Sequence, residues 1–113
     1  MNPTYTEDQL IIRIDRTGKV TVDDQENFRA FSMLIMAQPE DLDRIAAIVE
    51  PAIKLDGQGN AWIEADAVTA WANRANDAAW RGSFDRMVDF ARQHGWIQDE
   101  PLRIRAHVKT IAA

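Results

Sequence analysis

The sequence predicts an α+β fold of four helices, with an N-terminal β-hairpin and a C-terminal β-hairpin. Three observations predict it: alternating apolar and polar residues near the start, apolar residues at helical spacing through the middle, and a second alternating stretch near the end. A chain of 113 residues can bury one ordinary hydrophobic core, so we expect a single domain over residues 1–113. Residues 1–38 would form a hairpin and a helix, and residues 39–113 a second unit of that domain.

The N-terminal hairpin is predicted from residue 10 to residue 22. Its first strand has apolar residues at alternate positions, and its second strand is rich in β-branched residues. Gly18, in the loop between them, can take the left-handed conformation that a short hairpin loop requires. Thr6 and Gln9 have the spacing of a capping box, which leaves a helical start to the chain as an alternative.

The first helix is predicted from residue 23 to residue 38. Asp23 can cap its start, and Glu26 can reach back to the amide of the capping residue. Apolar residues then recur at helical spacing: Phe28, Phe31, Leu34 and Ile35. Met33 and Met36 make this helix apolar on nearly every side. We therefore expect it to be buried on several sides or to face a partner chain.

The second helix is predicted to begin at Pro39, because a proline in the first turn loses no hydrogen bond there. It is expected to end before Pro51, which disfavours the helical conformation in the residue before it. The glycine-rich residues 56–60 are the clearest loop in the chain, and residues 61–63 read as a short extended segment.

The third and fourth helices are predicted from their caps. Asp66 can begin the third, Ser83 can begin the fourth, and Gly95 supplies the stop of the fourth. This places the polar residues 73–77 in a break and leaves Trp80 in a loop. The other three tryptophans lie in apolar patterns and are expected in the core: Trp62, Trp71 and Trp96.

The C-terminal hairpin follows a turn at residues 99–101. Apolar residues occupy the even positions of its second strand, and polar residues occupy the odd positions: Arg103, Arg105, His107 and Lys109. This is the most regular alternation in the chain, and it predicts a strand with one buried face and one exposed face.

The order of elements from residue 39 onward resembles that of the winged helix-turn-helix domain. The resemblance implies that residues 83–94 form a helix facing the DNA groove and that residues 66–75 support it. It implies a transcriptional regulator, in which phosphate would be met by five arginines: Arg81, Arg86, Arg92, Arg103 and Arg105.

Net charge argues against that role. The chain carries −5, with −6 in residues 1–65 and +1 in residues 66–113, so it has no strongly basic segment. On the fourth helix, Arg86 and Arg92 are offset by Asp85 and Asp89 at pairing distance along the helix. A solvated amphipathic helix fits these charges better than a helix that reads bases.

Two loops, residues 15–26 and 56–64, resemble the EF-hand calcium loop in the placement of an aspartate and a glycine. Both depart from it: Val20 and Ala61 stand where the sharp turn needs glycine, and Lys19 stands at a ligand position. The chain has no cysteine, which removes thiolate metal sites, and no cofactor-binding motif. We therefore expect neither a metal nor a cofactor.

We expect a small non-catalytic protein-interaction or accessory protein. Tryptophan and arginine are enriched in binding hot spots, so the expected binding residues are Trp80 and Arg81, with Met33 and Met36 on the first helix. The expected partner is another protein or a second copy in a homodimer.

No stretch is apolar enough for a membrane span or a secretion signal, so a cytoplasmic location is expected. A second alternative to the interaction role, after the winged-helix regulator, is a small acid–base enzyme using His94 and Asp89.

Overall fold

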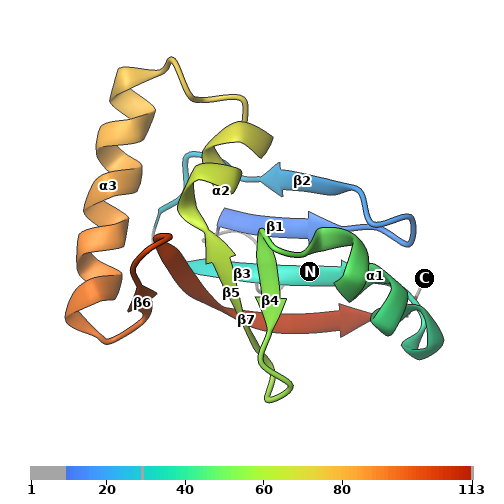
Figure 1. The fold of residues 1–113 in the computed structure, drawn as a ribbon. Coiled ribbons are helices and arrows are strands. Elements are labelled where there is room, and N and C mark those ends of the chain that lie inside the picture. Colours follow the sequence, from blue (N-terminus) through green and yellow to red (C-terminus); the bar gives the residue numbers. More distant parts are fainter. Residues whose placement is uncertain (1–9, 29, 113) are drawn as a thin grey trace, which may run out of the picture.

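The computed structural model describes residues 10–28 and 30–112, which form three α-helices and one seven-stranded mixed sheet (Figure 1). The α+β class is as predicted, but the prediction of four helices with a separate hairpin at each end is wrong. The helices are α1 (Leu42–Val49), which follows the 3-10 turn η1 (Pro39–Asp41), α2 (Ala65–Trp71) and α3 (Ala78–Gln93). The strands are β1 (Leu10–Ile14), β2 (Val20–Asp23), β3 (Phe31–Met36), β4 (Ile53–Leu55), β5 (Asn60–Glu64), β6 (Ile97–Gln98) and β7 (Arg103–Ile111).

The sheet has the strand order β2–β1–β3–β7–β5–β4, and β6 also pairs with β7. The pairs β1–β3 and β3–β7 are parallel, and the others are antiparallel. The first residues of β7 pair with β5 and β6, and its later residues pair with β3. A winged-helix unit over residues 39–113 would keep its last strand in a small wing of its own. Because β7 is instead hydrogen-bonded to β3, from before residue 39, the winged-helix expectation is wrong.

The segment predicted as the first helix forms β3, in the middle of the sheet. Met33 and Ile35 are buried, whereas the residues between and beside them are only partly buried, which is the period of a strand. A strand paired on both sides reads as a nearly continuous apolar run, and spacing alone does not distinguish it from a buried helix. Asp23 ends β2 instead of capping a helix, and its Oδ2 lies 3.0 Å from Nε of Arg13.

One face of the sheet packs with the helices to form the core. Alternate residues of β1, β3, β5 and β7 contribute to it, together with the buried sides of α1, α2 and α3. Figure 1 shows α3 beside the end of the sheet at which β1 and β3 begin. The alternation predicted for β7 is confirmed, since Ile104 and Ala106 are buried while Arg105 and His107 are exposed. No helix in the described part of the chain is long and apolar enough to cross a membrane.

The loops β1–β2 and β4–β5 share one geometry. Oδ1 of Asp15 and of Asp56 each accepts the backbone N–H groups two and four residues later, at 2.9 and 3.1 Å for Asp15 and at 2.7 and 3.1 Å for Asp56. Gly18 and Gly59, each three residues after the aspartate, both have φ of +88°. A repeated tight turn therefore accounts for the resemblance to the EF-hand loop. Among the described residues, no group of three or more histidine or acidic side chains is placed to hold a metal ion. The alternative helical start at Thr6 and Gln9 lies outside the described residues.

These matched loops give a prediction for two substitutions. Gly59→Ala is expected to lower the free energy of unfolding by about 1 kcal/mol, because alanine is strained at positive φ and the new Cβ meets nothing. Gly18→Ala is expected to cost about 1 kcal/mol more, because its Cβ would lie 2.8 Å from Cγ2 of Ile48 on α1. Urea unfolding of the two variants measures the difference. Equal losses would contradict the packing of the β1–β2 loop against α1.

Candidate functional site

The end of α3 turns a tryptophan back onto the helix. Gly95 has φ of +76°, and its N–H donates to the carbonyl of Arg92 at 3.2 Å. The N–H of Trp96 donates to the carbonyl of Ala91 at 3.0 Å, which completes the glycine-dependent helix stop known as a Schellman motif. The prediction that Gly95 ends this helix is confirmed. Because the chain reverses there, the indole of Trp96 lies against the last turn of α3 and its capping residue.

Three rings gather at this turn. The His94 and Trp96 rings stack with centroids 4.6 Å apart, and Phe90 lies 4.5 Å from His94 and 6.3 Å from Trp96. Phe90 is 53% exposed and Trp96 is 38% exposed, so the cluster lies at the surface. The placement of Trp96 in the core, expected from its apolar neighbours, is therefore wrong.

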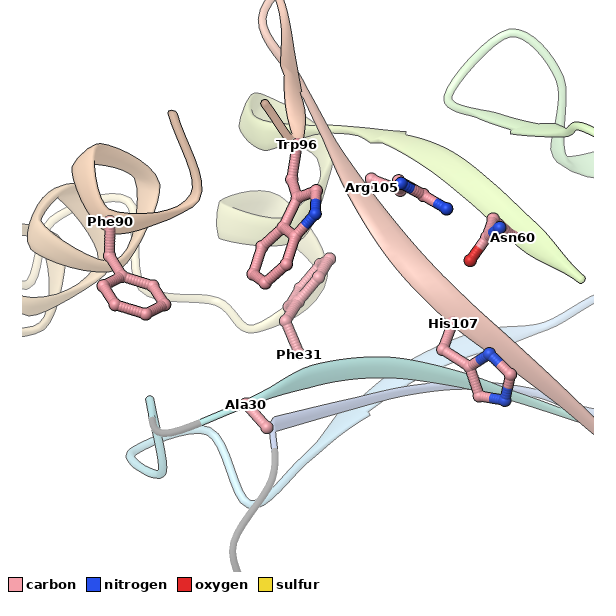
Figure 2. A pocket seen from close by; sticks show the side chains of 7 residues that line it. All are labelled: Ala30, Phe31, Asn60, Phe90, Trp96, Arg105 and His107. Carbon is pink, nitrogen blue, oxygen red and sulfur yellow. The ribbon is translucent and has the colours of Figure 1, made fainter. Parts of the chain in front are cut away.

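A pocket of about 400 Å³ opens beside this cluster (Figure 2). Phe90 and Trp96 reach it from the α3–β6 side, and Phe31 reaches it from the start of β3. Arg105 and His107 come from the exposed side of β7, and the other lining residues are Asn60 and Ala30. We call this set of seven residues the aromatic pocket.

Sheet pairing holds the polar side of the aromatic pocket in place. The N–H of Arg105 donates to the carbonyl of Trp96 at 2.9 Å, which fixes these two residues side by side. His107 is the register partner of Asn60 on β5 and of Ser32 on β3, so it sits where three strands meet. The arginine, the imidazole and the amide are thus carried by paired strands and not by a mobile loop.

The charge of the aromatic pocket is positive. None of its seven lining residues is acidic, and no carboxylate in the described part of the chain forms an ion pair with Arg105. The charge of Arg105 also acts on the nearby Asp56. The pKa of the Asp56 carboxyl is lowered chiefly by the hydrogen bond from the N–H of Gln58, and to a smaller extent by the charge of Arg105.

A second cavity, of about 440 Å³, lies along α3. It is lined by Phe28, Ser83, Arg86, Met87 and Phe90, and we call it the α3 groove. Phe90 lines both cavities, so the two are neighbours on the surface. Arg86 donates to Oγ of Ser83 at 3.0 Å and has no ion-pair partner in the described structure. The described residues of the α3 groove therefore add a second cation and no carboxylate.

Trp80 has a different setting from the one predicted. The helix α3 begins at Ala78, with Asp77 as its cap, so Trp80 lies in the first turn and not in a loop before Ser83. Its side chain is 4% exposed, and its Nε1 donates to the carbonyl of Gln25 at 2.7 Å. Its ring stacks on Phe84 with centroids 5.0 Å apart. Trp80 is thus part of the core and does not offer a surface to a partner.

The cap of α3 is linked to the chain between β2 and β3. Arg74 donates to Asp77 at 2.6 Å, to Glu26 at 3.0 Å and to Gln25 at 3.0 Å. Asp77 in turn accepts the backbone N–H of Trp80 at 3.0 Å. One arginine therefore positions both the start of α3 and the segment that leads into β3.

These hydrogen bonds predict a sensitivity to acid. The N–H of Trp80 and then the guanidinium of Arg74 hold the pKa of Asp77 below its ordinary value. A carboxyl with a lowered folded pKa stabilises the fold above its unfolded pKa of about 4, and this contribution is lost as the pH falls through the folded pKa. We therefore expect the urea midpoint to drop as the pH is lowered from about 5 to about 2.

The variant Asp77→Asn should show a shallower drop than the wild-type protein. The slope that remains comes from other carboxyls whose pKa values are lowered by their own hydrogen bonds: Asp15, Asp41, Asp56 and Asp99. The same pH dependence in the variant and the wild type would contradict this role for Asp77.

The other expected binding residues do not gather into one site. Met33 is buried, and Met36 ends β3 and is partly buried. Arg81 is exposed on α3, where it donates to the carbonyl of Ala75. The expected surface made by a first helix and a Trp80 loop is absent, because neither of those two elements forms.

The five arginines expected to meet DNA are spread over several settings. Arg92 forms two hydrogen bonds with Asp99, at 2.9 and 3.1 Å, and Arg103 lies 3.7 Å from Glu64 with its side chain largely buried. The remaining ones are Arg81, which lies outside both cavities, Arg86 in the α3 groove and Arg105 in the aromatic pocket.

The expected acid–base pair is not assembled. The ring of His94 packs on Phe90 and Trp96, and no hydrogen bond or ion pair in the described structure joins it to Asp89. Of the two histidines it is His107 that lines the aromatic pocket.

Phe31, Phe90 and Asn60 were not among the binding residues expected from the sequence, in which Phe31 was assigned to the apolar stripe of the first helix. The sequence does indicate that Phe90 is exposed, because this residue lies outside the apolar stripe of its helix. The convergence of Phe31 with β7 depends on a parallel pairing that no local pattern reveals. Neither a protein-family model, nor a curated protein, nor a solved structure matches this chain, so its function has to be argued from the pocket itself.

Proposed function

We propose that this chain is a non-catalytic binding protein whose ligand occupies the aromatic pocket. One observation carries the proposal: about 400 Å³ of concave surface combines three aromatic rings with an arginine, a histidine and an amide, and none of its described lining residues is acidic. Binding pockets for small groups have this size, with apolar walls and a few convergent polar groups. Aromatic side chains that are exposed in the free protein can bury a large apolar area against a ligand, which stabilises the complex.

Binding fits this lining better than catalysis. The described lining residues include one histidine but no carboxylate, hydroxyl or thiol that would act with it as a nucleophile or a second acid–base group. The rings and the Arg105 guanidinium instead select for a ligand with a planar apolar part and a negative charge. The aromatic faces would pack on the planar part, and the Arg105 guanidinium would hold the charge.

A fluorescent aromatic sulfonate, 8-anilinonaphthalene-1-sulfonate, tests this directly. We expect saturable binding at one site, weakened at least about tenfold by Trp96→Ala and by Arg105→Ala. Leu55→Ala serves as the control, because Leu55 is an exposed apolar residue that lines neither cavity. Binding that is equally strong in all three variants would show that the probe does not use the aromatic pocket and would overturn the proposal.

A further inference from the structure

We propose that the ligand of the aromatic pocket is a single strand of nucleic acid, which continues from the pocket into the α3 groove. This inference rests on the proposed function and adds the class of ligand. Its geometric basis is that the two cavities are neighbours and share Phe90 as a lining residue. An extended ligand can therefore lie in both, whereas a small molecule would fill only one.

The rings along this path suit unpaired bases. Phe90 and Trp96 are exposed at the junction, Phe31 lies in the aromatic pocket, and Phe28 lies in the α3 groove. Ser83 and Phe90 are seven residues apart on α3, so the groove between them is about 10 Å long. Successive bases of a single strand stack on aromatic side chains spaced along a groove, and every base has a face that can stack.

The cations along the path suit phosphate. Arg86 and Arg105 are arginines without an ion-pair partner in the described structure, one in each cavity, and His107 adds a donor in the aromatic pocket. None of the described residues that line either cavity is acidic. A polyanion would therefore meet one arginine in each cavity, and its affinity would depend on salt.

The net charge of −5 does not conflict with this surface. Several carboxylates are used elsewhere in the fold, as turn acceptors at Asp15 and Asp56 and as partners of arginines at Asp77 and Asp99. The side of β7 that faces away from the core instead carries three exposed basic residues, Arg105, His107 and Lys109, after the half-buried Arg103 that lies beside Glu64. The chain as a whole is therefore acidic, while the face of β7 that leads into the aromatic pocket is basic.

A duplex fits these cavities poorly. The rings line a hollow between α3, β6–β7 and the start of β3, and their faces are free to stack on an unpaired base. Bases in a helix are already stacked on each other, so a duplex would leave the rings without partners. An acidic peptide would match the charge of the path but offers no planar groups at regular spacing.

Fluorescence anisotropy with labelled oligomers of about 12 nucleotides tests the proposal. We expect single-stranded DNA or RNA to bind more tightly than a duplex of the same sequence, than AMP and than a poly-glutamate peptide of similar length. Trp96→Ala and Phe90→Ala should each weaken binding by about 5- to 150-fold through lost stacking. Arg105→Ala and Arg86→Ala should each reduce the steepness of the logarithmic salt dependence by about 0.7.

Arg16→Ala is the control. It removes one arginine from the β1–β2 loop, at the end of the sheet far from α3 in Figure 1, and should leave both affinity and salt dependence unchanged. Circular dichroism of each variant shows whether it is folded. Arg105→Ala changes an exposed strand position, so it keeps the test valid if Trp96→Ala fails to fold.

The outcomes separate the two proposals. If the oligomers fail to bind while the aromatic sulfonate still binds in a manner dependent on Trp96, the pocket stands and the nucleic-acid proposal is overturned. Equal or tighter binding of the duplex, of AMP or of poly-glutamate overturns it as well. If neither the sulfonate nor the oligomers bind, the proposed function itself fails.

Discussion

Trp80→Ala is expected to lower the free energy of unfolding by about 3–5 kcal/mol. The indole is almost fully buried, stacks on Phe84 and lies 5.6 Å from the ring of Phe28. Removing it leaves a cavity between α3 and the segment before β3, and the surrounding rings can fill it only in part. It also leaves the carbonyl of Gln25 without the N–H that it now accepts. A loss of this size is a large fraction of the stability of an ordinary domain.

Two further variants resolve this effect into its parts. Trp80→Phe keeps most of the ring but loses the N–H, so we expect a smaller loss of about 1–3 kcal/mol from the unpaired carbonyl and the smaller ring. Trp96→Ala is the matched control for tryptophan removal, because Trp96 is partly exposed, and it should cost less than about 1.5 kcal/mol. Urea unfolding followed by circular dichroism measures all three. A larger loss for Trp96→Ala than for Trp80→Ala would contradict the burial of Trp80.

Met33→Asp is expected to leave the chain largely unfolded at neutral pH. Met33 is 1% exposed, and its neighbours in the sheet are Ile12 on β1 and Val108 on β7. A carboxylate at this position would lose its water and gain no partner, which costs several kcal/mol. That cost is comparable with the whole stability of a small domain, about 5–15 kcal/mol.

Ser32→Asp introduces the same carboxylate one residue earlier in the strand and is the control for Met33→Asp. In β3 successive side chains face opposite sides of the sheet, so this carboxylate would lie on the side of His107, away from the core. We expect the variant to remain folded, with its far-UV circular dichroism and cooperative unfolding retained. Unfolding of both variants to the same extent would contradict the strand assignment of residues 31–36.

Local patterns predicted the elements whose signals are contained within a few residues. The alternation in β1 and β7, the proline that begins the turn before α1 and the glycine that ends α3 all have local physical causes, and each element lies where these signals place it. The start of α3 was missed because Ser83 and Asp77 are both good caps. The network around Arg74, which selects Asp77, includes Gln25 and Glu26 from a distant part of the chain.

The strand β3 was missed for a different reason. Its apolar residues suit either a helix or a strand buried on both sides, and the choice depends on β1 and β7 pairing with it. The same limit applies to the aromatic pocket. The exposed side of β7 was predictable and Phe90 was inferable, but their approach to Phe31 follows from the parallel pairing of β3 with β7. The sequence thus predicts which side chains of one strand are exposed. It does not predict that three separate elements come together to form a pocket.

The position of β7 has a consequence for how the protein is made. It lies between β3 and β5, yet it is synthesised after both of them. Until it leaves the ribosome, the nascent chain presents two open strand edges, one on each side of the gap that β7 will fill. Such edges pair readily with strands of other chains. We therefore expect nascent chains that lack β7 to depend on chaperones, and full release of β7 to close the sheet in a single late step.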